Sequence, residues 1–434
     1  MLVILRGFLL LFLLYHVLVT VLGFGIFQGN FPQIPALARD GLWMVLLIGY
    51  FFTSLSTFKS YRRQRKQLRY LFFTLLGISV FFSYIQEKTI YDMFVGFKYG
   101  FHYIFLFLSA TFLGHVFAKP DTKQHTLERD EKVYGFLRFF VWTLVSVVVI
   151  GFFWQGAKLI FPDFFFWLGY GPLNDFFFGV HPPIYYLTGF GGTLRWQGIF
   201  AGPNNYGYFL VVFLPLIISY FKFSLNSWKD IFIKKQNLIS LFVYFLRFGA
   251  IVLTLSRSAL LGTIVVLFLM NIHRWKRHWK ISIAIIGIGI IGIFGLSFLK
   301  ESSTLAHITA KFSSIGYVLS KPLGYGLGSS GPAIHHNGNI LPENYFIQLL
   351  IDIGIIGFLI FVGWYIVCRK KIKKMFHGEL FGSYIRAFAI GWIALLIMGI
   401  FLHVFEDSMV NYTFFTFFGV IIGYVFHTKK EPSK

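Results

Sequence analysis

The sequence predicts an all-α polytopic membrane protein with about 12 transmembrane helices, both termini in the cytoplasm and two long outer loops. Two features of the composition support this prediction. Of the 434 residues 56% are hydrophobic, and 13% are charged, which is about half the roughly 25% of soluble domains. The third observation is that long apolar runs recur along the chain. The single cysteine, Cys368, excludes a disulfide scaffold and a metal site built on thiolates.

The individual spans follow from the length of the apolar runs, because a transmembrane helix needs roughly 20 mostly apolar residues. The pair of spans on either side of Arg257 is the least regular, since two short helices must turn sharply there. The predicted spans are residues 7–27, 41–58, 70–86, 95–118, 136–157, 205–223, 238–255, 258–272, 281–299, 344–367, 382–403 and 410–427.

The positions of Lys and Arg set the orientation, because cytoplasmic loops of membrane proteins are enriched in these residues. Six segments hold 26 of the 39 basic residues, and with twelve spans all six fall on the side of the N-terminus. We therefore assign the net charge of +22 to topology rather than to binding of nucleic acid. The six segments are residues 59–69, 119–132, 222–235, 273–280, 369–374 and 428–434.

The predicted organisation alternates groups of spans with the two outer loops. Long loops in a compact protein tend to be functional. The first loop is rich in Gly, Pro and aromatic residues, a composition suited to the membrane interface. The parts are residues 1–157 with five spans, 158–204 as the first large outer loop, 205–299 with four spans, 300–343 as the second outer loop, and 344–434 with three spans and a cytoplasmic tail.

Two arginines stand at the predicted outer ends of spans. Arg195 precedes a Gly-Pro-Asn-Asn turn that opens a span; the alternative is an interfacial anchor, with Asn204 or Asn205 capping the helix. Arg257 interrupts an apolar run, where a cation is expensive unless it has a partner or a water-filled cavity. The alternative for Arg257 is a side chain that reaches up to the interface.

The end of the second outer loop carries candidate proton acceptors. Glu343 stands at a helix start beside apolar spans, where desolvation would move the pKa of its carboxyl toward neutrality and make it a general base. The alternative is an acid placed in the first turn by the helix dipole. His335 and His336 are rival bases. Asp352 lies inside a span, where an ionisable group usually has a functional or a paired role, and Arg247 is one conceivable partner.

Three motifs, in this order along the chain, resemble those of the O-antigen polymerase/ligase family of bacterial membrane glycosyltransferases. They are the Arg195-to-Asn204 segment, the Ser256-Arg257-Ser258-Ala259 run, and Glu343-Asn344 followed after nine residues by Gly354-Ile355-Ile356-Gly357. Ligases of the family carry a proposed catalytic histidine where this chain has Glu343. The departure favours a polymerase over a ligase.

The resemblance implies a multi-pass enzyme of the bacterial inner membrane whose donor is a polyprenyl-diphosphate-linked glycan. Arg195 and Arg257 are then the expected diphosphate ligands, because the planar guanidinium binds phosphate oxygens in pairs. We expect no cofactor and no metal. The catalytic base is Glu343, His336 or His335, with support from Asn204, Asn344 and Asp352; aromatic rings that would stack on sugars are Trp167, Trp196 and Tyr206.

The predicted function is polymerisation of lipid-linked oligosaccharide repeat units into a surface, capsular or exopolysaccharide on the outer leaflet. The alternatives are an O-antigen-type ligase that transfers the glycan to another acceptor, and a transporter or flippase of lipid-linked sugars. Transporter sites usually lie near the midplane on broken helices, whereas the distinctive residues here gather at the ends of spans. The expected partners are the lipid bilayer, a flippase and a chain-length regulator, with no nucleic acid.

Overall fold

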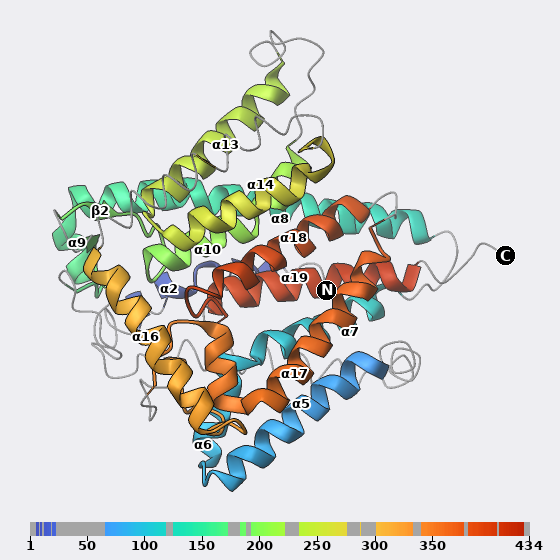
Figure 1. The fold of residues 1–434 in the computed structure, drawn as a ribbon. Coiled ribbons are helices and arrows are strands. Elements are labelled where there is room, and N and C mark those ends of the chain that lie inside the picture. Colours follow the sequence, from blue (N-terminus) through green and yellow to red (C-terminus); the bar gives the residue numbers. More distant parts are fainter. Residues whose placement is uncertain are drawn as a thin grey trace. The chain divides into compact units, whose positions relative to one another are not determined.

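The computed structural model of the chain is mostly helical (Figure 1). The predicted spans 41–58 and 281–299 lie outside the described residues, apart from residue 287, and 7–27 is described in part. The structure describes residues 6–7, 9–10, 13–18, 20–22, 66–118, 125–171, 183–187, 192–221, 234–275, 287, 301–332, 340–376, 381–405 and 408–428.

The chain forms two compact units, and each is described by itself. The first unit consists of Met1–Met44, Pro120–Lys300 and Ile390–Leu395; the second consists of Val45–Lys119, Glu301–Ala389 and Leu396–Lys434. The described elements of the first unit are α2 (Tyr15–Leu18), α8 (His125–Ile160), α9 (Pro162–Trp167), β1 (Tyr186–Leu187), β2 (Leu194–Arg195), α10 (Pro203–Val212), α11 (Leu214–Tyr220), α13 (Lys235–Leu253) and α14 (Arg257–Trp275).

In the first unit, α10 packs against α13 and α14, and α13 also contacts α8 (Figure 1). Contact between α10 and α14 is close because Gly207 lacks a side chain: a Cβ there would lie 2.8 Å from the Cβ of Ala259. The predicted span 205–223 is divided at Phe213 into α10 and α11, where Pro215 removes a backbone donor. The short antiparallel pair β1–β2 joins the loop segments before α10.

The second unit contains two closely packed helix pairs, α7 with α19 and α5 with α17 (Figure 1). Its described elements are α5 (Lys66–Ile85), α6 (Ile90–Gly100), α7 (His102–Ala118), α16 (Glu301–Ser320), α17 (Tyr345–Lys373), α18 (Gly382–Met398) and α19 (Ser408–Thr428); residues 390–395 of α18 group with the first unit.

Glycines allow the backbones of α7 and α19 to touch. A Cβ on Gly114 of α7 would lie 2.0 Å from the carbonyl oxygen of Val420, and one on Gly423 of α19 would lie 2.1 Å from that of Thr111. Gly419 and Gly423 are four residues apart and so lie on the same face of α19. This is the small-residue spacing through which membrane helices approach closely.

Helix α17 is broken at Gly354, which has φ 66° and ψ −178°. The loop between α16 and α17 enters the break: Tyr325 N donates to the carbonyl oxygen of Ile351 at 2.7 Å, and Ile355 N donates to that of Pro322 at 2.9 Å. In an unbroken helix Ile355 N would bond Ile351 O directly. The loop therefore supplies both partners that the break removes.

Four helices are long and apolar enough to cross a bilayer among the residues that the structure describes, which supports a membrane protein. They are Asp130–Ile160, Lys235–Leu253, Tyr345–Lys373 and Met409–Phe426. Helices Ile90–Gly100 and His102–Val116 form a fifth span if the pair, bent by 67°, is counted as one. The full number of twelve spans and the sidedness of the termini stay predictions.

Two further predicted elements differ from the structure. The predicted outer loop 300–343 contains a 20-residue helix, α16, which sequence reasoning missed because its composition is too polar for a span. The predicted span 95–118 is bent at Phe101, between α6 and α7. By contrast, the predicted break around Arg257 is confirmed, because α13 ends at Leu253 and α14 begins at Arg257.

Candidate functional site

The first candidate site surrounds the half-buried Arg195 on β2. Its Nε donates to the carbonyl oxygen of Thr254 at 3.0 Å, and its Nη2 donates to Oδ1 of Asn204 at 2.8 Å. These bonds use two of the five N–H donors of a guanidinium. The backbone next to Arg195 is bound to the same end of α13, because Trp196 N donates to the carbonyl oxygen of Leu253 at 2.9 Å. Arg195 is therefore fixed against the C-terminal end of α13.

Asn204 binds Arg195 and does not cap its own helix. The N-cap residue of α10 is Gly202, with Pro203 following and no side-chain hydrogen bond at the cap. The predicted alternative in which Asn204 or Asn205 is the N-cap residue is therefore wrong. Pro203 is suited to the first helical position, where its missing N–H has no partner in any case.

Arg257 is the electrostatic neighbour of Arg195. Burial lowers the pKa of the Arg195 guanidinium to about 10; Tyr208 and Tyr186 raise it, and the charge of Arg257 lowers it further. Arg195 still carries its charge at neutral pH. The structure thus brings together the two arginines that the sequence singled out, and their charges repel each other.

Carboxylates contribute nothing to the electrostatics of Arg195 in the described part of the chain. In the first unit the described carboxylate side chains are Asp130 and Glu131 near the start of α8, and the exposed Asp163 of α9. A pair of neighbouring guanidinium groups with no carboxylate acting on Arg195 is suited to binding an anion.

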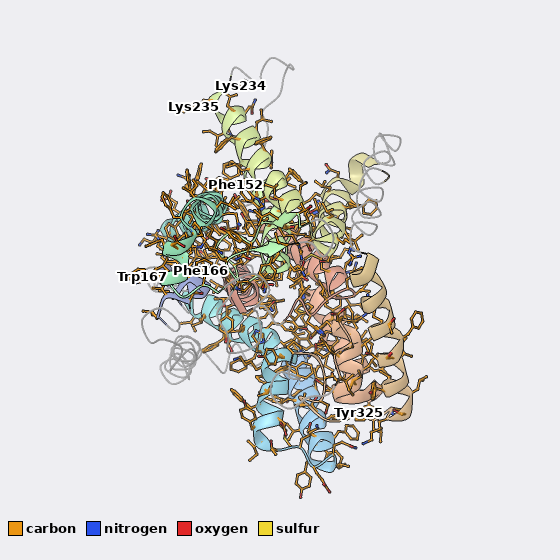
Figure 2. The ribbon with its side chains drawn as sticks, turned by 90° about the vertical axis from the view of Figure 1, so that its left-hand side faces the viewer. Phe152, Phe166, Trp167, Lys234, Lys235 and Tyr325 are labelled. Carbon is orange, nitrogen blue, oxygen red and sulfur yellow. The ribbon has the colours of Figure 1, made fainter. Side chains whose placement is uncertain are left out.

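The pair lies at one end of a candidate span. Lys234 and Lys235 stand at the beginning of α13 (Figure 2), and Thr254, which binds Arg195, follows its last residue. The 19 residues of α13 rise about 28 Å, close to the roughly 30 Å of the hydrocarbon core. Arg195 is therefore about one membrane thickness from the lysine end of this helix.

The three aromatic residues that were predicted to stack on sugars have different environments. Trp167, labelled in Figure 2, is 73% exposed. It stacks on Phe164, with ring centroids 5.9 Å apart. Trp196 packs edge-on against Phe152, with ring centroids 4.9 Å apart. Tyr206 is fully buried and stacks on Phe200, with ring centroids 5.2 Å apart, so stacking of its ring on a sugar stays a prediction.

The second candidate site is the beginning of α17 in the second unit. Asn344 is the N-cap residue: its Oδ1 accepts from Phe346 N at 2.9 Å and from Ile347 N at 3.1 Å. Its Nδ2 donates to the carbonyl oxygen of Ile400 at 2.8 Å. Asn344 therefore ties the helix start to the turn after α18, which explains its burial.

Glu343 precedes this cap and is half-buried, with φ at 48°. This left-handed conformation is rare for residues other than glycine. Leu255, two residues before Arg257, has the same φ of 48°. Strained residues of this kind tend to persist at functional sites because the surrounding structure holds them there.

His403 is a residue of this region that sequence reasoning missed. It is 7% exposed, and its Nδ1 lies 2.8 Å from Oε1 of Gln348, one turn into α17. The turn that carries it is fixed by Tyr345 N, which donates to the carbonyl oxygen of Gly399 at 2.9 Å. The signal available in the sequence was a histidine near the end of an apolar span. His335 and His336, the predicted rival bases, lie outside the described residues.

Asp352 holds the loop that enters the break in α17. Its Oδ1 accepts from Ser330 Oγ at 2.7 Å, and the backbone N–H groups of Ser330 and Gly328 also donate to this carboxylate. Arg247, its conceivable partner, instead donates to the carbonyl oxygens of Leu210 at 2.8 Å and Phe209 at 3.2 Å, at the end of α10. Each side chain therefore has partners within its own unit.

The two glycines of the third motif, Gly354 and Gly357, are not sites of close contact with a neighbouring helix. A Cβ on Gly354 would lie 2.3 Å from the carbonyl carbon of Leu323, which belongs to the entering loop, and one on Gly357 would meet Ile353 of the same helix at 2.8 Å. Neither of these contacts is with a neighbouring helix. Gly354 instead admits the loop.

Groups of three or more metal-binding side chains are absent among the described residues. No known protein family, curated protein or solved structure matches the chain.

Proposed function

We propose that the protein is a membrane glycosyltransferase that polymerises polyprenyl-diphosphate-linked oligosaccharide repeat units on the outer leaflet of the bacterial inner membrane. The observation that supports it most is the pairing of Arg195 with Arg257 at the end of α13 opposite Lys234 and Lys235. By the positive-inside rule that end faces outward. Three N–H groups of Arg195 beyond its two described bonds are suited to phosphate oxygens.

The proposed reaction transfers a glycan from one lipid diphosphate to a sugar hydroxyl of another lipid-linked unit. The hydroxyl oxygen forms a bond to the anomeric carbon, and the bond from that carbon to the diphosphate oxygen breaks. The electron pair leaves with the diphosphate, whose growing charge the arginines stabilise. Within the second unit, Glu343 is the proposed acceptor of the hydroxyl proton.

Polymer formation by purified protein from lipid-linked repeats tests this proposal. Arg195→Ala and Arg257→Ala are expected to reduce the rate by roughly 10²–10³. Each Arg→Lys variant is expected to fall between wild type and Ala, because Lys keeps the charge and loses the planar fork. Arg138→Ala, which removes an exposed arginine of α8, is the matched control. Wild-type rates in both Ala variants would refute the role of the arginines.

The two alternative functions have their own readouts. A ligase would attach the glycan to a different acceptor, and the lipid-linked chains would not become longer. A transporter is favoured by one observation, the break in α17 at Gly354, because transporter sites often lie on broken helices. Movement of lipid-linked repeats across proteoliposomes without elongation would support it. The loop that fills the break speaks against a substrate site there.

A further inference from the structure

Lys158, in the last turn of α8, is a fully buried cation outside the arginine pair. Its Nζ has no hydrogen-bond partner, and no charged side chain in the described part of the chain acts on it. Among the described residues, the ring of Tyr170 is the contact that favours its charge, with its centroid 4.3 Å from Nζ. A buried ammonium without an anion is costly, and such residues are usually kept for function.

Three further buried polar atoms lack hydrogen-bond partners beside the same face of α8. They are Nε2 of Gln155, Oε1 of Gln197 and Oη of Tyr206. Gln155 and Lys158 are three residues apart, so their side chains lie on one face of the helix. Gln197 N donates to Oε1 of Gln155 at 3.4 Å, which places the loop segment after β2 against this face.

Tyr206 joins the same group from α10. A Cβ on Gly151, one turn before Gln155, would lie 3.0 Å from the Tyr206 hydroxyl oxygen. Gln155, Gln197 and Tyr206 thus line the contact between α8 and the segment from Gln197 to Tyr206, and Lys158 lies about one turn further along the same face of α8. Buried polar groups are nearly always hydrogen-bonded, so a group of four such atoms calls for a ligand or for water.

We propose that Lys158, Gln155 and Tyr206 form a second oxyanion site, which binds a carboxylate or phosphate group of the glycan donor. The ammonium, the amide N–H and the phenol O–H are all donors, the set that an oxyanion accepts from. This inference rests on the proposed function for the identity of the donor. It implies either an acidic sugar in the repeat unit or a second contact to phosphate.

The site is distinct from the arginine pair. The charges that act on Arg195 are those of Tyr208, Tyr186 and Arg257, and Lys158 is not among them. The two sites are nevertheless linked through the chain, because Gln197, which donates to Gln155, follows Arg195 by two residues. The flexible stem of Lys158 allows its ammonium to move while the helix stays in place.

Thermal unfolding of the purified full-length protein in detergent tests the site, with sodium diphosphate and glucuronate as probes and glucose and sodium chloride as neutral and ionic-strength controls. Lys158→Met removes the charge and keeps the length. Lys132→Met, an exposed lysine of the same helix, is the matched control. Tyr206→Phe removes a single hydroxyl and is the second variant should Lys158→Met not fold.

We expect one of the two oxyanions to raise the melting temperature of wild type and Lys132→Met by about 2–4 °C. The rise should vanish in Lys158→Met and shrink in Tyr206→Phe, while glucose has no effect. Without ligand, Lys158→Met should melt higher than wild type, because a buried charge is removed. A response to glucuronate identifies a carboxylate, and one to diphosphate identifies a phosphate.

Two results would overturn the inference: no stabilisation of wild type by either oxyanion, or equal stabilisation in wild type and Lys158→Met. Either result leaves the proposed function standing if the Arg195 and Arg257 variants lose polymer formation. Conversely, normal polymer formation in both Ala variants removes the proposed function. Loss of oxyanion stabilisation in Lys158→Met would then still establish an anion site.

Discussion

Nη2 of Arg195 donates to Oδ1 of Asn204 across 2.8 Å, and this bond joins β2 to the first turn of α10. Together with the bond to the Thr254 carbonyl oxygen, it fixes the plane of the guanidinium. Asn204 therefore acts on the proposed diphosphate site through Arg195. A fixed donor is worth more to catalysis than a mobile one, because no reorganisation is needed as charge develops.

Loss of the Asn204 amide should lower activity without loss of the cation. We expect Asn204→Leu to reduce the rate of polymer formation by about 10–100-fold, the range for a hydrogen bond to a charged group. Asn204→Asp should also impair binding of the diphosphate, because a carboxylate would compete for Arg195. Asn271→Ala is the control, since Asn271 bonds within α14. Unchanged rates in Asn204→Leu would refute the positioning role.

Replacement of Glu343 tests its proposed role as the general base. Glu343→Gln keeps the shape and removes the base, so we expect a loss of about 10²–10⁴-fold in rate. Glu343→His should keep part of the activity, and that activity should increase as pH rises through about 6.5, where imidazole loses its proton. His335→Ala and His336→Ala are compared in the same assay. Full activity of Glu343→Gln beside an inactive histidine variant would move the base to that histidine.

The left-handed backbone at Glu343 makes a separate prediction about stability. Glu343→Gly should raise the free energy of unfolding by about 1 kcal/mol, because glycine adopts this conformation without strain, and should abolish polymer formation. Glu87, with φ at 57°, is the matched control in the same unit. Glu87→Gly should give a similar gain in thermal stability with normal activity. Loss of stability in Glu343→Gly would show that its side chain is a structural contact.

Gly354 should tolerate no side chain. Its φ and ψ are open mainly to glycine, so Gly354→Ala costs about 1–3 kcal/mol in backbone strain, and its Cβ would collide with the loop at Leu323. Gly363→Ala, in the same helix with no atom near its Cβ, should stabilise by about 0.5–1 kcal/mol. Thermal unfolding of both variants in detergent measures the contrast. Equal effects would mean that the loop does not occupy the break.

The predicted topology can be tested by labelling engineered cysteines in intact cells, in a variant whose buried Cys368 is replaced by Ala. Sites on the basic side should resist an impermeant reagent, and sites on the other side should react with it. The engineered cysteines should stand at exposed positions, because a fully buried position such as Ser330 would resist the reagent on either side of the membrane. We expect protection at Lys132, Lys235 and Lys370, and labelling at Trp167 and Lys321. Labelling at Lys235 would invert the first unit and remove the outer-leaflet site.

The sequence predicted those parts of the structure that local patterns determine. Glu343 was predicted to stand at a helix start, and the structure places the next residue, Asn344, at the N-cap of α17. The break at Arg257 was also predicted from neighbouring residues alone, as was the alternation of apolar runs with basic segments. The helix α16 was missed because its composition is too polar for a span, and its apolar side chains Phe312, Ile315 and Leu319 are exposed rather than gathered on a buried face.

Contacts with backbone groups could not be predicted from residue types. Arg195 binds the carbonyl oxygen of Thr254, and any residue there would offer the same oxygen. The burial of Lys158 depends on how the segment around Gln197 folds back on α8, and residue types do not reveal that fold. The pairing of α7 with α19 did have a signal, the spacing of Gly419 and Gly423.

The loop that enters the break in α17 has a consequence for biogenesis. If the helix were broken without the loop, the carbonyl oxygen of Ile351 and the N–H of Ile355 would lack partners, and each such group costs several kcal/mol in the bilayer. The segment from Pro322 to Tyr325 precedes α17 in the sequence and so leaves the ribosome first. It must already lie on the membrane when α17 is inserted, so the order of synthesis matches the order in which these two segments have to assemble.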